Sequence, residues 1–155
     1  MSVTLRPFRA EDLPLLDAWA SAIGLEAYLH RRRPRVEAAT GHAPDRGLFW
    51  YVILVAGAEA GTLWLEPDED GMRLSIFLGD PQRFGQGIGR AAIHLAVSDV
   101  QAVHPGVPIH LNVRTSNARA IACYRRAGFS LVEEAVKTTP AGEVIPYCRM
   151  TLPGV

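Results

Sequence analysis

A glycine-rich stretch, residues 80–92, constrains this chain more than any other segment. Gly85, Gly87 and Gly89 occupy alternate positions between an apolar run and an alanine-rich helical pattern. Glycine lets a backbone turn tightly and approach a ligand with no Cβ in the way. A helix that begins here points free backbone N–H groups and the positive end of its dipole at whatever binds. The stretch therefore predicts a phosphate-binding turn.

Length and composition bound the other possibilities. The 155 residues, 48% hydrophobic and 21% charged, suffice for a core without metal or disulfides, so we expect one domain, residues 1–155. A formal net charge of zero favours neither nucleic acid nor a membrane surface as partner. Cys123 and Cys148 lack metal-ligand spacing, so we expect packed, reduced thiols and no metal. The sequence shows no signal-peptide pattern and no apolar run near the ~20 residues of a membrane span, so we expect a cytoplasmic protein. Its oligomeric state is open, a homodimer included.

Hydrophobic periodicity predicts a mixed α/β chain of the order βααβββαβαββ. Expected strands lie at 3–8, 49–55, 60–66, 72–79, 109–114, 129–136 and 144–152. Expected helices lie at 12–24 with Asp12 as N-cap, 25–32, 87–103 and 117–127 with Asn117 as N-cap. Pro146 predicts an edge position or a bulge in the last strand. The basic run at 31–35 predicts either a solvated surface or a clamp for an anionic ligand.

Two common phosphate-binding sites do not suit this glycine stretch. Residues 87–92 satisfy the G-x-G-x-x-A form of a dinucleotide fingerprint, but that site follows the first strand of a βαβ unit. Here a hairpin precedes the stretch, and too little chain remains for a six-stranded doubly wound sheet. A Gly-Lys-Ser/Thr sequence for nucleotide triphosphates is absent. A nucleotide-binding module is therefore the less favoured interpretation.

Two segments together resemble the GNAT superfamily of acetyl-CoA-dependent N-acetyltransferases. Gly87 and Gly89 fill the glycine positions of its Gln/Arg-x-x-Gly-x-Gly/Ala motif. Phe84 occupies the first position, with Arg83 one residue earlier, and an aromatic residue there is similar to the branch that acetylates ribosomal-protein termini. The second segment resembles that family's strand, Asn, helix, Tyr and Gly-Phe pattern through Leu111-Asn112-Val113-Arg114, Asn117, Ala120-Ile121, Tyr124 and Ala127-Gly128-Phe129.

The resemblance implies a fold and an activity. The fold would be an α/β (α+β) acyl-CoA N-acyltransferase fold: a mixed, mostly antiparallel sheet of about seven strands, helices on both faces, and a splay between the strands at 72–79 and 108–114. The activity would be direct transfer of acetyl from acetyl-CoA to a primary amine in a ternary complex. The acceptor would be a small-molecule amine or a peptide or protein N-terminus. Residues 138–142 are also similar to aminoglycoside 6′-N-acetyltransferases, whose acidic acceptor positions correspond here to Ser75 and Asn112. Both are neutral, which argues against a polycationic acceptor.

The resemblance also assigns the cofactor contacts. It places them on the splayed strand, the glycine stretch and the helix after the second segment: Ile76, Phe77, Leu78, Arg83, Phe84, Gly85, Gln86, Gly87, Ile88, Gly89, Arg90, Asn117 and Tyr124. Tyr124 is also the predicted general acid for the thiolate, although an aromatic residue at this helical position equally suits core packing. Asn117 equally suits a plain helix cap.

Strand alternation is the basis for predicting the catalytic base and the acceptor pocket. Alternation places Arg73, Ser75 and Asn112 on the polar face of the two splayed strands, where we expect the acceptor pocket. His110 shares that face and is the first candidate base, since an unperturbed histidine has a pKa near 6.5. Glu66 is the second. A structural histidine and deprotonation through water are the alternatives. A catalytically idle acyl-CoA-binding domain is the alternative to an enzyme.

Overall fold

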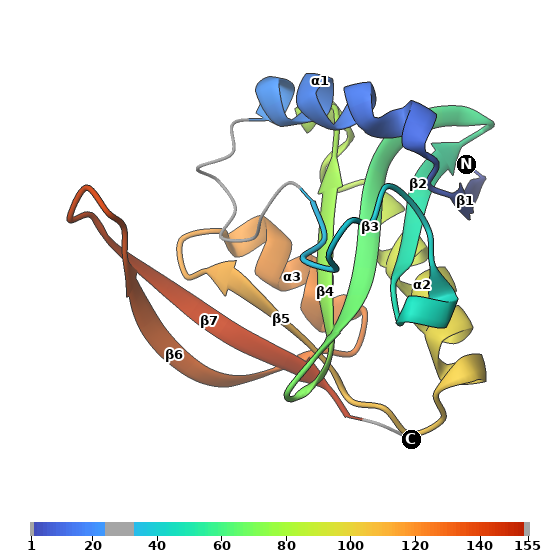
Figure 1. Cartoon of the computed structure of the whole chain (residues 1–155). Helices are drawn as coiled ribbons and strands as arrows, with labels where there is room; N and C mark the ends of the chain where they lie inside the picture. Colours follow the sequence, from blue (N-terminus) through green and yellow to red (C-terminus); the bar gives the residue numbers. More distant parts are fainter. Residues whose placement is uncertain (1, 24–32, 154–155) are drawn as a thin grey trace.

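One seven-stranded sheet organises the computed structural model, which describes residues 2–23 and 33–153 (Figure 1). The strand order is β1-β2-β3-β4-β5-β7-β6. All neighbouring strands are antiparallel except the parallel pair β4–β5. The strands are β1 (Val3–Pro7), β2 (Phe49–Val55), β3 (Ala58–Asp68), β4 (Gly71–Leu78), β5 (Ile109–Arg114), β6 (Ser130–Thr138) and β7 (Val144–Leu152). The predicted mixed, mostly antiparallel sheet is confirmed.

Helices cover both faces of the sheet, as predicted. Helix α1 (Leu13–Ile23) packs on one face, and α2 (Ile88–Val103) and α3 (Ala118–Arg126) lie on the other (Figure 1). The α1 side holds a cluster of large aromatic and aliphatic residues that includes Trp50, Trp64 and Phe77. The α2 and α3 side holds a second, larger cluster. In the described ranges, no helix is both long and apolar enough to cross a membrane.

A close contact fixes α1 at the end of β4. A Cβ added to Gly79 would lie 1.9 Å from Cδ1 of Trp19. No side chain fits there, so the absent Cβ lets the Trp19 indole lie directly on the backbone. Since Gly79 immediately precedes the glycine stretch, this contact anchors the start of that stretch to α1.

The prediction that Asp12 is the N-cap of α1 is wrong. A 3-10 helix (Ala10–Asp12) precedes α1, and the Asp12 carboxylate accepts the Arg9 N–H (2.9 Å) instead. The same carboxylate pairs with Arg6 at 2.7 Å. It therefore joins the end of β1 to the turn before the helix. The helix predicted at 25–32 lies outside the described residues, as do the first two residues of the basic run.

Pro146 occupies an internal strand, and the register shift between β6 and β7 falls at Leu131/Glu133 in β6, so the predicted edge position or bulge in the last strand is wrong. β7 lies between β5 and β6, and β6 is the edge. The Pro146 carbonyl accepts the Thr115 N–H (3.2 Å), one residue beyond the end of β5. In a strand the N–H and C=O of one residue point to the same side. An N–H at Pro146 would therefore point toward Thr115, past the last β5–β7 pair. Its absence removes no hydrogen bond between β5 and β7.

Lowering the pH below about 6.5 is expected to reduce the free energy of unfolding through His42. Burial lowers the pKa of His42, whose Nδ1 accepts the Trp50 N–H at 2.9 Å. The unfolded chain then binds the proton more readily, so stability present above the unfolded pKa is lost as the pH falls toward the folded pKa. Urea unfolding at pH 7.5 and 5.5 measures this loss. His42→Gln keeps an acceptor without titrating and should lose less; an identical loss in both proteins would contradict the assignment.

Candidate functional site

The glycine stretch forms a turn that only glycine fits well. A 3-10 helix (Pro81–Arg83) opens it, capped by the Asp80 carboxylate, which accepts the Gln82 N–H at 2.9 Å. Gly85 and Gly87 both have φ of +81°, the left-handed region that other residues enter at a cost. Gly87 is the N-cap of α2. The predicted tight turn into a helix is therefore present.

The turn presents a row of backbone donors. Within the described chain, the N–H groups of residues 85–90 have no backbone acceptor outside α2, and the first three residues of a helix have none within it. The first N–H that does find one is that of Ala91, which donates to Gly87 O at 3.1 Å. Nothing lies within 4 Å of where a Cβ of Gly85 or Gly87 would stand. These open donors at a helix N-terminus suit a phosphate or pyrophosphate.

Gly89 has a packing role. A Cβ added there would lie 3.2 Å from Sγ of Cys123 and 3.9 Å from Cδ1 of Ile76. Gly89 therefore allows the start of α2 to approach α3 and β4 closely. The three segments that the sequence assigned to the cofactor meet at this point.

Arginine side chains surround the turn, including two that the sequence reasoning missed. The Arg119 guanidinium lies 5.3 Å from the centre of the Phe84 ring, a cation–π contact. Phe84 in turn packs against the core, so the unusual aromatic residue supports α3. Burial raises the pKa of Cys123, while the charges of Arg126 and Arg90 oppose that rise. Arg119 and Arg126 gave no sequence signal, because basic residues on a short helix usually indicate a solvated face.

The strands β4 and β5 separate as predicted. They pair only at Met72↔Ile109 and Arg73↔His110. The Met72 N–H donates to Pro108 O (3.0 Å) on the β5 side. Alternate residues of a strand direct their backbone groups to the same side, so those of Leu74, Ile76 and Leu78 also point toward β5, where no ladder continues. Phe77 directs its side chain into the α1 cluster instead.

Helix α3 brings Tyr124 and Asn117 to this region. The Asn117 side chain accepts the Ala120 N–H at 3.2 Å, which confirms its role as helix cap. Tyr124 is buried with its ring edge-on to Phe129, the centroids 6.2 Å apart. It lies one residue from Cys123, whose Sγ leaves little room for a side chain at Gly89. Core packing is therefore observed for Tyr124, and its role as general acid stays a prediction.

The polar residues of β3, β4 and β5 lie on the α1 side of the sheet. Asp68 Oδ1 lies 2.9 Å from Nε2 of His110, and His110 Nδ1 is buried without a partner in the described ranges. Burial disfavours charge on Asp68, but the hydrogen bond with His110 holds the Asp68 pKa below its usual value.

The other polar residues of this face include Glu66, which accepts the Arg35 N–H at 2.6 Å. Ser75 is buried, and Asn112, half-buried, accepts from Arg73 (3.3 Å) once its amide is correctly oriented. Alternation thus grouped these residues correctly.

One group on this face resembles a metal site only in composition. Ligand atoms of Asp68, Asp70 and His110 lie within 4.8 Å of one another. However, Asp68 is hydrogen-bonded to His110, and Asp70 pairs with Arg149 at 2.9 Å. Both carboxylates are therefore engaged by protein donors, and we assign no metal to them.

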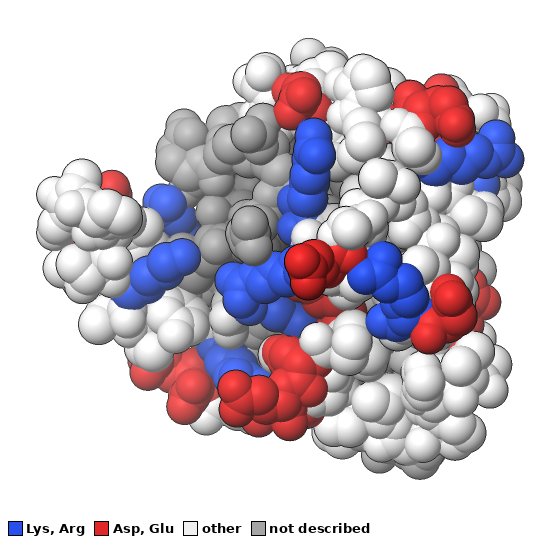
Figure 2. Space-filling model, viewed as in Figure 1, with Lys and Arg blue, Asp and Glu red and all other residues white. Residues whose placement is uncertain are grey.

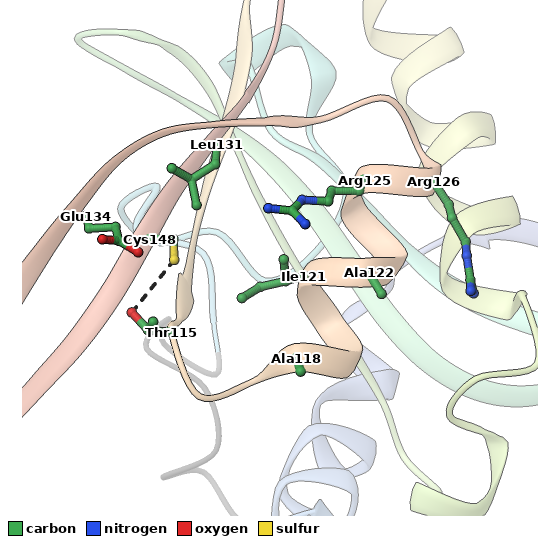
Figure 3. A pocket seen from close by; sticks show the side chains of 9 residues that line it. All are labelled: Thr115, Ala118, Ile121, Ala122, Arg125, Arg126, Leu131, Glu134 and Cys148. Atoms are coloured by element: carbon green, nitrogen blue, oxygen red, sulfur yellow. Dashed lines mark hydrogen bonds between the residues drawn. The ribbon is translucent and has the colours of Figure 1, made fainter.

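A cavity of about 500 Å³ lies between α3 and the β6–β7 hairpin (Figure 3). Arg125 points into it, whereas Arg126 points away from it (Figure 3). Cys148 donates weakly to Thr115 Oγ1 at 3.7 Å in its wall. The α3 residues that line it, Ala118, Ile121, Ala122 and Arg125, are spaced as one helix face. Cys123 and Tyr124 occupy the face toward the core, so α3 separates this cavity from the glycine turn.

Residues 2–130 match the family model of the acetyltransferase (GNAT) domain. The chain is similar to a mycothiol acetyltransferase of Propionibacterium freudenreichii subsp. shermanii, with 34% identity over 146 residues, 86% of this chain and 45% of that protein. A mycothiol acetyltransferase of Jonesia denitrificans is 38% identical over 88 residues, 54% of this chain and 27% of that protein. A kanamycin resistance protein of Rhizobium radiobacter is 32% identical over 92 residues, 56% of this chain and 80% of that protein. The chain spans less than half the length of the two mycothiol acetyltransferases.

Solved structures share the fold at low identity. A phosphinothricin acetyltransferase of Sinorhizobium meliloti in complex with AcCoA has a TM-score of 0.76 and 22% identity, covering 99% of this chain and 89% of that one. The aminoglycoside acetyltransferase AAC(6′)-Ib in complex with coenzyme A has a TM-score of 0.71 and 22% identity, covering 98% and 95%. The ribosomal-protein-S18-alanine N-acetyltransferase of Escherichia coli has a TM-score of 0.68 and 23% identity, covering 98% and 94%.

Gly87→Ala is expected to weaken coenzyme A binding about tenfold, whereas Gly57→Ala should leave it unchanged. The two glycines have φ of +81° and +83°, and an added Cβ meets nothing within 4 Å at either. Both variants therefore carry the same left-handed strain in the folded protein, about 1–2 kcal/mol. A loss of about 1.4 kcal/mol of binding free energy lowers affinity tenfold. Only Gly87 orients the donors of the turn. Isothermal titration and urea unfolding of both variants check this; equal affinities would exclude the turn from the binding site.

Proposed function

The chain belongs to the GNAT acetyltransferase family, and on this premise we propose that it transfers an acetyl group from acetyl-CoA to a primary amine in a ternary complex. The observation that carries the proposal is the meeting of the glycine turn, the separated strands and α3 at Gly89. A module that only bound nucleotides would not need two strands that separate beside the phosphate site.

The residues present fit an acyl-coenzyme A. The N–H groups of residues 85–90 would hold the pyrophosphate, with charge from Arg83, Arg90 and Arg119 nearby. The backbone groups of Leu74, Ile76 and Leu78 on the β5 side would bond the pantetheine amides and polarise the thioester oxygen. Acetyl-CoA supplies the thioester and the acetyl group.

Tyr124 is proposed as the general acid that protonates the departing thiolate. Its position supports this role: it is buried on the core side of α3, next to Cys123, whose Sγ faces the place where a Cβ of Gly89 would stand. Asn117 caps the same helix and is proposed as a further pantetheine contact.

His110 is proposed as the base that takes the proton from the attacking amine. With Asp68 accepting the Nε2 proton, Nδ1 carries the free lone pair, the arrangement in which a carboxylate fixes the tautomer and orientation of a histidine base. Glu66 is the weaker candidate, because its carboxylate already accepts the Arg35 N–H.

The acceptor is proposed to be a small-molecule amine or a peptide or protein N-terminus. Neutral Ser75 and Asn112 at the separated strands do not support a polycation. A cytoplasmic location, a homodimeric assembly and a metal-free site stay predictions.

Tyr124→Phe is expected to lower kcat by about 100-fold or more while coenzyme A still raises the melting temperature. The phenyl ring keeps the packing against Phe129 and removes the hydroxyl that is the proposed proton donor. Tyr51→Phe is the matched control, because this buried hydroxyl bonds to Asp99 (2.8 Å) away from the glycine turn, so its loss should cost stability without lowering kcat. Thiol release with a panel of amines measures turnover. Unchanged turnover in Tyr124→Phe would remove Tyr124 from the mechanism, and no turnover in the parent protein with coenzyme A bound would favour an idle binding domain.

His110→Gln is expected to lower kcat/KM about 100-fold, and Asp68→Asn by a smaller factor. The first variant removes the base, and the second leaves it in place without the partner that fixes its tautomer. Steady-state kinetics at several pH values compare both with the parent protein. Parent-like kinetics in His110→Gln would instead support deprotonation through water.

A further inference from the structure

Three arginines, Arg35, Arg73 and Arg149, lie close together on the polar face of the sheet. Figure 2 shows Lys and Arg side chains gathered at the centre of this face, below α1 and beside the β6–β7 hairpin. Arg35 and Arg149 both lie close enough to Arg73 for their charges to act on its guanidinium. The two acids nearest Arg73 are Glu66, its cross-strand partner, and Asp68. These charges decide what chemistry this face can bind.

The acids of the face are already engaged by other donors. The Glu66 carboxylate accepts the Arg35 N–H at 2.6 Å. Asp68 bonds to His110 at 2.9 Å. Asp70 pairs with Arg149 at 2.9 Å. Each carboxylate therefore already has an oxygen bonded to a donor of the protein other than Arg73.

Among the described residues, Arg73 has no ion-pair partner. The described residues place no carboxylate oxygen within 4.0 Å of its guanidinium, and its one polar contact is the neutral Asn112 oxygen at 3.3 Å. Arg73 is half-buried, and burial together with Arg35 and Arg149 lowers its pKa despite the nearby acids. A half-buried guanidinium whose donors lack an anionic acceptor is an unfavourable arrangement that an incoming anion would relieve.

Arg73 lies where β4 and β5 separate. Arg73 belongs to the last β4–β5 pair, opposite His110, and the strands diverge immediately beyond it. It therefore stands beside the proposed base. A planar guanidinium binds carboxylate or phosphate oxygens with two parallel hydrogen bonds, so it fixes orientation as well as affinity.

We propose that the acceptor amine carries an anionic group, a carboxylate or a phosphate-type acid, and that Arg73 binds this group and so orients the amine toward His110. The proposal rests on the proposed acetyl transfer and names its substrate class. Arg73 is a specificity-determining residue in this assignment, and Arg35 and Arg149 supply supporting charge.

The test compares acceptors that share an amine and differ in the acid. Suitable pairs are glutamate with glutamic acid diamide, glycine with glycinamide, and 2-aminoethylphosphonate with ethanolamine; the first two probe carboxylate and the third phosphonate. The measured quantity is the acid-to-neutral ratio of kcat/KM in the parent protein divided by the same ratio in Arg73→Gln, so the intrinsic reactivity of each amine cancels. We expect this quotient to be about tenfold or more for at least one pair. Arg73→Lys should fall between, because it keeps the charge without the paired donors.

Three further measurements make every outcome informative. Arg9→Gln removes an exposed arginine outside this face and should leave the quotient near one. Turnover of neutral amines by Arg73→Gln shows that the variant folds. Thermal shifts of the coenzyme A-loaded protein by the same acids and amides test binding without turnover, with larger shifts by the acids expected in the parent protein only.

The proposal and the acetyl transfer beneath it fail differently. Quotients near one for all three pairs, or equal thermal shifts by acid and amide, overturn the role of Arg73 even if acetyl transfer proceeds. No thiol release from any amine, with coenzyme A bound, contradicts acetyl transfer itself. In that case a preference of the loaded protein for acids that Arg73→Gln abolishes still supports the anion site.

Discussion

The parallel pairing of β4 with β5 ends after two residue pairs, and the arrangement of the site depends on this limit. Beyond Arg73 and His110 the backbone groups of β4 that face β5 have no ladder partner. Backbone donors and acceptors need partners, so an unpaired strand edge inside a sheet favours a ligand with amide groups of its own. The glycine turn follows the same strand directly, which places its row of backbone N–H donors at the end of this edge.

The sheet separates two chemistries by its faces. On the side of α2 and α3, apolar side chains pack around Ile76 and Tyr124, and Gly89 allows the helices to approach β4. On the side of α1, β4 and β5 carry the polar residues Arg73, Ser75, His110 and Asn112 near the point where they separate. Asp68 of the neighbouring strand β3 bonds to His110 there. A residue period of two therefore lets one short pair of strands present unpaired backbone groups along its edge and polar side chains on one face, the two features on which the proposed function rests.

Sequence patterns predicted the family, the sheet and the main turn, because these depend on local constraints. Left-handed φ at Gly85 and Gly87 and the cap at Asn117 follow from residue type within a few positions. Errors arose where distant contacts decide. Asp12 serves Arg6 and Arg9 in preference to α1, and Pro146 is internal because β7 inserts between β5 and β6. Neither strand order nor an ion pair between loop and strand can be read from periodicity.

The sequence by itself determined the kind of ligand that the turn suits, since glycine spacing before a helix sets the backbone donors. It also determined which residues share a face of each strand. Only the tertiary structure decided which charges on that face pair with one another in the part of the chain that it describes. Glu66, Asp68 and Asp70 each meet a donor from another segment, and Arg73 meets none of them within ion-pair distance. Charge neutralisation depends on distances of a few ångströms between separate strands. The composition, with equal numbers of acidic and basic residues, does not indicate these distances.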